Sequence, residues 1–212
     1  MLPVEIVPGL LRWSAPHPGW EPGAAPGSSS DWEETVGSVM FEAEDCVVLI
    51  DPQLPRDGRE EFLERLDELV AGRPVSVLTT IRWHRRDRDE LAARYAANSS
   101  RAWNAVPPGV EPRPLRGAGE TMYWLPSAAA LVPGDRLLGD PERGLRVCPE
   151  SWLSRVQVDR AGLARLIGAL IELPIERVLV SHGQPVLHDG RAAVARAVAD
   201  AGGGSGTLAL GL

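Results

Sequence analysis

Apolar and polar residues alternate with two different periods along this chain of 212 residues. Alternation at every second position, or a short apolar run, predicts a strand, whereas apolar residues three and four positions apart predict a helix. Strands are therefore expected at residues 2–15 (two short strands broken at Pro8-Gly9), 36–41, 46–51, 75–80, 101–105, 113–116, 121–125, 128–132 and 177–181. Helices are expected at residues 59–70, 87–97, 159–171 and 191–200, with Asp87 and Asp159 as N-caps.

The order of these elements indicates the fold class. Strands come first, strand–helix units and more strands follow, and a helix, a strand and a helix close the chain. Such an order does not fit a regular doubly wound sheet, and it predicts an α/β (α+β) fold in which helices flank two packed mixed sheets. We expect a single domain over residues 1–201, with a Pro/Gly/Ser-rich surface loop at 15–34 and a flexible tail at 202–212.

Composition and charge exclude several functions. All 22 basic residues are arginine, so the chain has no lysine for a Schiff base, a phosphate-binding loop or a kinase site. A net charge of −7 without a basic stripe argues against a nucleic-acid partner. No apolar run is long enough to span a membrane, and the N-terminus has no signal-peptide pattern. The two cysteines, Cys46 and Cys148, suggest no disulfide, so we expect a cytoplasmic protein.

Polar residues that could carry chemistry follow four of the expected strands. They are Asp51, the loop from Arg82 to Asp89 with its single histidine His84, Asp135, and His182. Functional residues of α/β proteins commonly lie at the carboxyl ends of strands, so these positions form one candidate site. The early loop also carries His17 and two tryptophans; such a loop either covers a pocket or only packs down on the surface.

In this order and spacing, the motifs resemble those of the metallo-β-lactamase superfamily over about residues 35–199. The matching segments are Ile50-Asp51, the polar loop after Thr80, Gly119-Glu120-Thr121, Gly134-Asp135 and Ser181-His182-Gly183-Gln184-Pro185. The resemblance implies a four-layer αββα sandwich with a metal site at one edge of the two sheets.

The loop after Thr80 departs from the family pattern, which has two histidines separated by one residue and, after a further residue, an Asp-His pair. One register aligns His84 with the second histidine, and the other positions then hold Arg82, Arg86 and Asp87. If His84 is instead the first histidine, the remaining positions hold Arg86, Arg88 and Asp89. Both registers place arginine at two ligand positions, where a guanidinium has no lone pair for a metal. Glu120 likewise replaces the histidine of a Gly-His-Thr turn.

The resemblance therefore implies a reduced, mononuclear metal site. The candidate ligands are His84, Asp87, Glu120, Asp135 and His182. Three protein ligands and a water suffice for one catalytic zinc ion, with iron or manganese as the next alternatives for so oxygen-rich a set. Asp51 and Asp135 are the candidate catalytic residues, Asp51 by accepting a hydrogen bond from the water or from a ligand histidine. Arg82 and Arg86 are candidates for binding an anionic substrate.

The sequence leaves two main functions open, and a third is a scaffold that works through a dimer surface or its tryptophan-bearing loop. The first is a metal-dependent hydrolase acting on an ester, thioester, amide or phosphoester of a small, anionic molecule. The alternative is a metal-free, non-catalytic member of the fold with a degenerate site that binds a small anionic ligand through the loop arginines. Neither hypothesis needs a nucleic acid or a membrane, and a homodimer is compatible with both.

Overall fold

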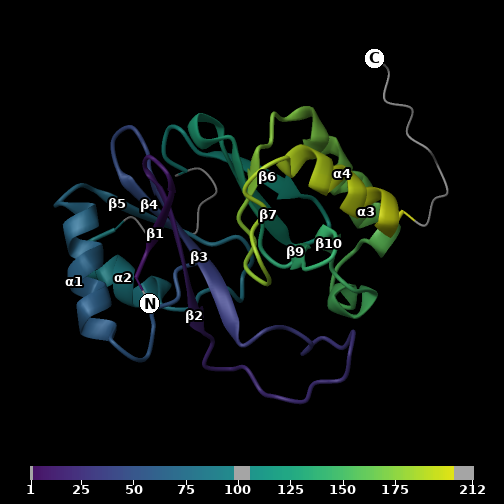
Figure 1. Cartoon of the computed structure of the whole chain (residues 1–212), viewed down its shortest axis with the longest axis horizontal. Helices are drawn as coiled ribbons and strands as arrows, with labels where there is room; N and C mark the ends of the chain where they lie inside the picture. The colour runs from purple at the N-terminus through teal and green to yellow at the C-terminus, as the bar shows by residue number, and fades with distance from the viewer. Residues whose placement is uncertain (1, 98–105, 203–212) are drawn as a thin grey trace.

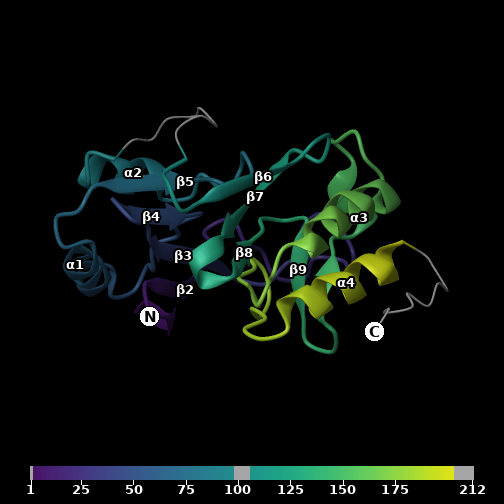
Figure 2. The same cartoon turned by 90° about the horizontal axis from the view of Figure 1, so that it is seen from above.

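The computed structural model describes residues 2–97 and 106–202. Two sheets pack face to face, and helices cover the outer face of each. Figures 1 and 2 show α1 (Arg59–Val70) and α2 (Arg88–Arg94) on one side and α3 (Arg160–Gly168) and α4 (Gly190–Ala201) on the other. The expected αββα sandwich is confirmed. In the part of the chain that is described, no helix is long and apolar enough to cross a membrane.

The first sheet has the strand order β1-β2-β3-β4-β5. Its strands are β1 (Val4–Val7), β2 (Leu10–Pro16), β3 (Thr35–Glu42), β4 (Val47–Ile50) and β5 (Val75–Leu78). The first four pair antiparallel, whereas β4 and β5 run parallel, which requires the crossover that α1 supplies. The carboxyl ends of β4 and β5 therefore meet at one edge, where the chain continues into Asp51 and into the loop with His84.

The second sheet has the order β11-β8-β7-β6, and a separate hairpin joins β9 and β10. The bounds are β6 (Glu111–Leu115), β7 (Glu120–Leu125), β8 (Ala130–Val132), β9 (Leu137–Asp140), β10 (Gly144–Val147) and β11 (Arg177–Val178). Short 3-10 turns follow β7 (η2, Pro126–Ala128), β10 (η3, Glu150–Leu153) and α3 (η4, Ala169–Glu172). Strand β11 runs parallel to β8, so the segment after β11 emerges at the same edge as the segment after β8.

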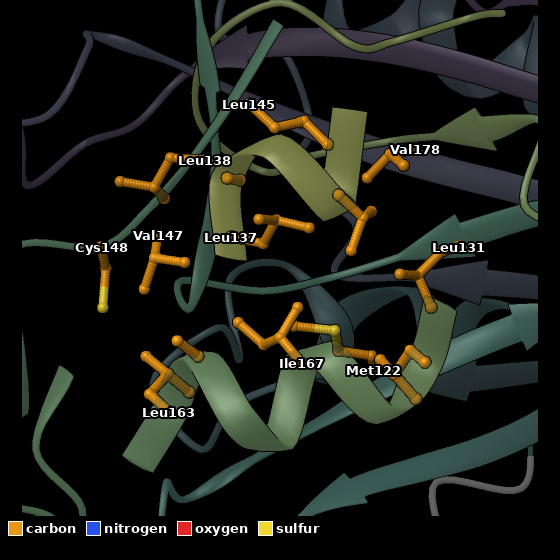
Figure 3. Packing of buried hydrophobic residues seen from close by; sticks show 14 of the residues in the cluster. Met122, Leu131, Leu137, Leu138, Leu145, Val147, Cys148, Leu163, Ile167 and Val178 are labelled. Carbon is orange, nitrogen blue, oxygen red and sulfur yellow. The ribbon is translucent and has the colours of Figure 1, made fainter. Parts of the chain in front are cut away.

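Alternating side chains of the central strands bind the layers together. Val48 and Ile50 of β4 join a cluster between the two sheets, whereas Val47 and Leu49 join a cluster under α1. Successive side chains of a strand point to opposite faces, so a strand that is buried on both faces needs apolar residues at every position. A third cluster lies beneath α3 and α4. Figure 3 shows Leu163 and Ile167 of α3 within it, together with residues of β7 and the β9–β10 hairpin.

Several predicted elements differ from the structure in extent. The strand expected at 101–105 lies outside the described residues, as does nearly all of the expected tail. The helix expected at 159–171 divides into α3 and η4, and Asp159 caps it by accepting the N–H of Gly162 at 2.6 Å. The strand expected at 177–181 is only two residues long, because pairing with β8 ends at Val178. The β9–β10 hairpin was not predicted.

Candidate metal centre

Three of the predicted site residues converge at the shared edge of the two sheets. His84 follows β5, Asp135 lies between β8 and β9, and His182 follows β11. One ligand atom from each lies within 4.8 Å of the other two, and all three residues are buried. The Nε2 atoms of His84 and His182 lie 2.8 Å and 3.2 Å from the same carboxylate oxygen, Oδ1 of Asp135. Segments distant in sequence thus bring three potential ligands to one point.

The surroundings of Asp135 fit a metal ligand. Trp83 donates its indole Nε1–H to Oδ2 at 2.5 Å, which fixes the carboxylate plane. Oδ1 is buried and, within the described residues, has no hydrogen bond of good geometry, although two imidazoles approach it. The charges of His84 and His182 hold the pKa of Asp135 well below its usual range, against the opposing effect of burial. Two imidazoles and one carboxylate with a free oxygen form a donor set that suits zinc.

Asp51 holds the ring of His84 from the other side. Its carboxylate accepts the Thr80 backbone N–H and lies 2.8 Å from His84 Nδ1, and Thr80 Oγ1 also donates to it. Burial and Arg86 disfavour a charged His84, but Asp135 and Asp51 outweigh them and raise its pKa to about 9. The left-handed φ of 47° at Asp51 turns the chain sharply out of β4. Asp51 is placed to orient His84 rather than to bind a metal.

Glu120, expected among the ligands, does not join the group. Its carboxylate accepts three backbone N–H groups, from Gly134 at 3.0 Å, Asp135 at 2.7 Å and Arg136 at 3.0 Å. Burial, aided by Asp135, raises the pKa of Glu120 to about 7. An added Cβ at Gly134 would lie 2.5 Å from Thr80 Oγ1, so only glycine fits there. The role of Glu120 is to fix the turn that carries Asp135.

Asp87, the other acidic candidate in the loop, also lies outside the group. Its Oδ2 accepts the Leu54 backbone N–H at 2.6 Å and the Gln53 side-chain N–H at 2.8 Å. Asp87 occupies the N-cap position of α2 as expected, but its side chain makes no capping hydrogen bond there. The carboxylate instead ties the segment after β4 to the start of α2. In the described structure His84 is thus the loop's one contribution to the group.

Arg82 and Arg86, the candidate anion-binding residues, have different surroundings. Arg86 donates at 2.7 Å to the carbonyls of Gly37 and Asp51, and at 3.3 Å to Ser181 Oγ. Burial lowers its pKa. Its guanidinium therefore joins β3 to the ends of β4 and β11, and none of these hydrogen bonds goes to His84, Asp135 or His182. Arg82 is exposed at the cavity rim, with its guanidinium 5.7 Å from the centre of the Trp83 ring.

A cavity of about 660 Å³ opens onto the group formed by His84, Asp135 and His182. Several of the residues that line it were not predicted from the sequence. His17 and Trp32 come from the β2–β3 loop, defined as residues 17–34, and Trp152 and Arg155 come from η3 and the segment after it. Burial lowers the pKa of His17 to about 4, and nearby Arg86 acts in the same direction. The tryptophans of the early loop indicated that this loop could cover a pocket. Nothing in the sequence indicated that Trp152 lines the cavity.

Comparison of the sequence with known proteins gives no match, either to a family model or to a curated protein. Comparison of the structure with solved structures does give matches. A metallo-β-lactamase from Erythrobacter litoralis is 15% identical and aligns over 94% of this chain and 91% of its own, with a TM-score of 0.60. A metallo-β-lactamase family protein from Thermus thermophilus is 17% identical over 92% and 80%, with a TM-score of 0.51.

A third similar structure is the metallo-β-lactamase FIM-1 from Pseudomonas aeruginosa, solved in a mono-zinc form. It is 12% identical and aligns over 94% of this chain and 95% of its own, with a TM-score of 0.55. Identities this low establish a shared architecture and leave the activity to be argued from the site. The structure similarity and the order of the motifs agree, and the chain has the metallo-β-lactamase fold.

Proposed function

We propose that this protein is a hydrolase with a single metal ion, most simply zinc, held by His84, Asp135 and His182. The observation that carries the proposal is the convergence of three buried ligand atoms within 4.8 Å of one another, from three separate segments. Zinc at catalytic sites is commonly held by three protein ligands and leaves one coordination position open. A bound zinc ion supplies a Lewis acid and lowers the pKa of water to about 7.

The residues of the chain supply orientation. Asp51 accepts a hydrogen bond from His84 Nδ1, so Nε2, which faces Asp135, is the nitrogen that would give up its proton to bind a metal. Trp83 fixes Oδ2 of Asp135 and leaves Oδ1 for the metal. These outer contacts determine the tautomer and the direction of each ligand, on which metal affinity depends. Trp32, Trp83 and Trp152 form part of the cavity walls beside the group.

The cavity favours a negatively charged substrate. Its walls include four arginines, Arg82, Arg86, Arg136 and Arg155, against one carboxylate, that of Asp135. Arg82 and Arg155 are exposed at the rim, where each could pair bidentately with a carboxylate or phosphate, whereas Arg86 and Arg136 are engaged with backbone carbonyls. An ester, thioester, amide or phosphoester of a small anion is the substrate class that this lining supports.

One observation favours a second candidate, a metal-free protein that only binds an anion. His84 lies between the carboxylates of Asp51 and Asp135, so a protonated ring donates to both and offsets one of their two negative charges without any metal. Such a ring would hold the two carboxylates in place without a metal, at the desolvation cost of a buried ion pair. The four arginines would then attract an anionic ligand that the protein holds but does not cleave.

Metal content separates the two candidates. The protein is purified without added metal and dialysed against zinc, and bound zinc, iron and manganese are then measured by elemental analysis. The hydrolase proposal expects about one zinc ion per chain, lost in His84→Ala and His182→Ala. His188→Ala is the matched control, because His188 is exposed and remote from the group. A wild-type protein that retains no metal after zinc loading would overturn the hydrolase in favour of the anion-binding protein.

A further inference from the structure

The ring of His182 contacts two tryptophans that are far apart in sequence. Trp32, from the β2–β3 loop, lies 5.4 Å from it between ring centroids, and Trp152 of η3 lies 5.8 Å away. Interplanar angles of 69° and 82° make both contacts edge-to-face, a favourable arrangement for aromatic rings. The two tryptophans therefore restrict rotation of the His182 ring from two directions.

This support differs in kind from that of His84. A metal-ligating histidine usually donates its second ring N–H to a carboxylate or carbonyl, as His84 does to Asp51. The corresponding atom of His182, Nδ1, is buried and has no hydrogen-bond partner among residues 2–97 and 106–202. Within that part of the chain, packing against Trp32 and Trp152 replaces the hydrogen bond as the constraint on the ring.

Both tryptophans are themselves held in place. Trp152 donates its indole N–H to Ser28 O at 2.8 Å, and its carbonyl accepts from Arg136 at 3.1 Å. The carbonyl of Trp32 accepts the indole N–H of Trp20 at 2.8 Å. Besides the hydrogen bond from Trp152 to Ser28, a hydrogen bond from Ser151 Oγ to Gly27 O joins the β2–β3 loop to η3. The loop is thus docked on η3 at the point where both rings meet His182.

We propose that Trp32 and Trp152 are positioning residues for His182, which they hold with Nε2 directed at Asp135. The β2–β3 loop is then part of the metal centre although it supplies no ligand. This inference rests on the metal binding proposed above, and it assigns to the tryptophans the task that Asp51 performs for His84. Loss of one ring frees His182 to rotate, and a freely rotating ligand binds metal more weakly.

Zinc affinity measured by competition with a chromophoric chelator tests the inference. Trp32→Ala is expected to weaken zinc binding about 10-fold or more, the usual effect of removing an outer contact of a ligand histidine. Trp32→Phe keeps an aromatic edge against His182 and is expected to stay within about threefold of wild type. The midpoint of urea unfolding without metal is measured in parallel, and Trp32→Leu replaces Trp32→Ala if the alanine variant does not fold.

Trp20→Ala is the matched control, because Trp20 belongs to the same loop and donates its indole N–H to the carbonyl of Trp32, not to its ring. It removes a hydrogen bond that holds the backbone of Trp32 while both rings beside His182 remain, so it is expected to weaken zinc binding less than Trp32→Ala does. Equal weakening in Trp20→Ala and Trp32→Ala would overturn the inference, since loop order alone would then explain it. Unchanged affinity in Trp32→Ala would overturn it too, and would leave zinc binding by the wild type intact. A wild type that binds no zinc would remove the proposed function and this inference together.

Discussion

Asp51 is the residue whose charge and position most directly control a single ligand. Replacement by Asn keeps the shape but puts an amide where the carboxylate now accepts from Thr80 and His84. We expect Asp51→Asn to lower zinc affinity about 10-fold or more, because His84 loses the acceptor that fixes its tautomer. A chelator competition titration measures the effect. Asp57→Asn, at an exposed position before α1, is the control, and equal affinity in both variants would contradict this role.

Glu120 affects stability rather than ligation. A glutamine in its place has one acceptor oxygen instead of two, so at least one of the three N–H groups around Asp135 loses its partner. A buried donor left unpaired costs about 1–3 kcal/mol, and we expect Glu120→Gln to lower the free energy of unfolding by that amount. Denaturant titration provides the measurement. Glu111→Gln, in an exposed pair with Arg113, should change it by less than about 0.5 kcal/mol.

At the residue scale the sequence predicted positions better than it predicted contacts. His84, Asp135 and His182 were identified because each follows a strand whose carboxyl end reaches the same sheet edge. Asp87 and Glu120 were placed among the ligands from their positions in the motifs of the resembled family, yet both carboxylates face backbone N–H groups. Position along the chain does not determine which donors a buried carboxylate meets, since these donors come from segments remote in sequence.

At the scale of elements, periodic segments and continuous apolar runs were predictable, whereas short strands interrupted by glycine and charged residues were not. The helix at Arg59–Val70 has the bounds expected from its apolar stripe. The β9–β10 hairpin escaped prediction because glycine and charged residues interrupt its short apolar pairs and leave no clear period, and it is stabilised by packing against α4. Pairing with β8 likewise decides where β11 ends. Tertiary contacts, which a single sequence does not display, fix these short elements.

The contact between α1 and α2 gives a prediction with a defined pH dependence. Asp67 of α1 accepts hydrogen bonds from Arg94 of α2 and from Tyr95 beside it, and Arg94 in particular lowers the pKa of Asp67. A pKa lowered by folding stabilises the protein above the unfolded value and loses this effect as the pH falls through the folded value. The pair is partly exposed, so we expect Asp67→Asn to cost only about 0.5 kcal/mol near pH 7.

The same variant should approach wild-type stability as the pH falls below the ordinary range of aspartate, because a protonated Asp67 side chain and the asparagine that replaces it are both neutral. Urea unfolding of both proteins at several pH values measures the difference. Glu64→Gln, on α1 and without an ion pair in the described structure, is the control. A difference between wild type and Asp67→Asn that stays constant down to acidic pH would contradict the ion-pair explanation.

At the scale of the whole molecule, the site exists only because separate parts of the fold meet. One ligand follows the first sheet, two follow strands of the second, and the β2–β3 loop docks on η3 above them. The sequence predicted the two sheets and their shared edge, but it left open whether the loop reaches the site. Loop docking depends on single hydrogen bonds and ring contacts between distant segments, which have no periodic signature.

If the three residues hold zinc as proposed, this arrangement links metal binding to global stability. Unfolding separates His84, Asp135 and His182, so zinc should bind the folded protein far more tightly than the unfolded chain. A ligand at 100 times its Kd then stabilises the folded state by about 2.7 kcal/mol. For a protein of this size that corresponds to a rise in Tm of roughly 5–10 °C. Thermal unfolding followed by circular dichroism, with and without zinc, measures the shift.

The controls for this shift separate the metal group from the rest of the surface. Magnesium should leave the Tm unchanged, because imidazole nitrogens suit zinc and not magnesium. His188→Ala should keep the zinc-dependent rise, since His188 is exposed and remote from the group, and His182→Ala should lose it. A Tm that zinc leaves unchanged in the wild type, or raises equally in His182→Ala, would show that these three residues do not hold the ion.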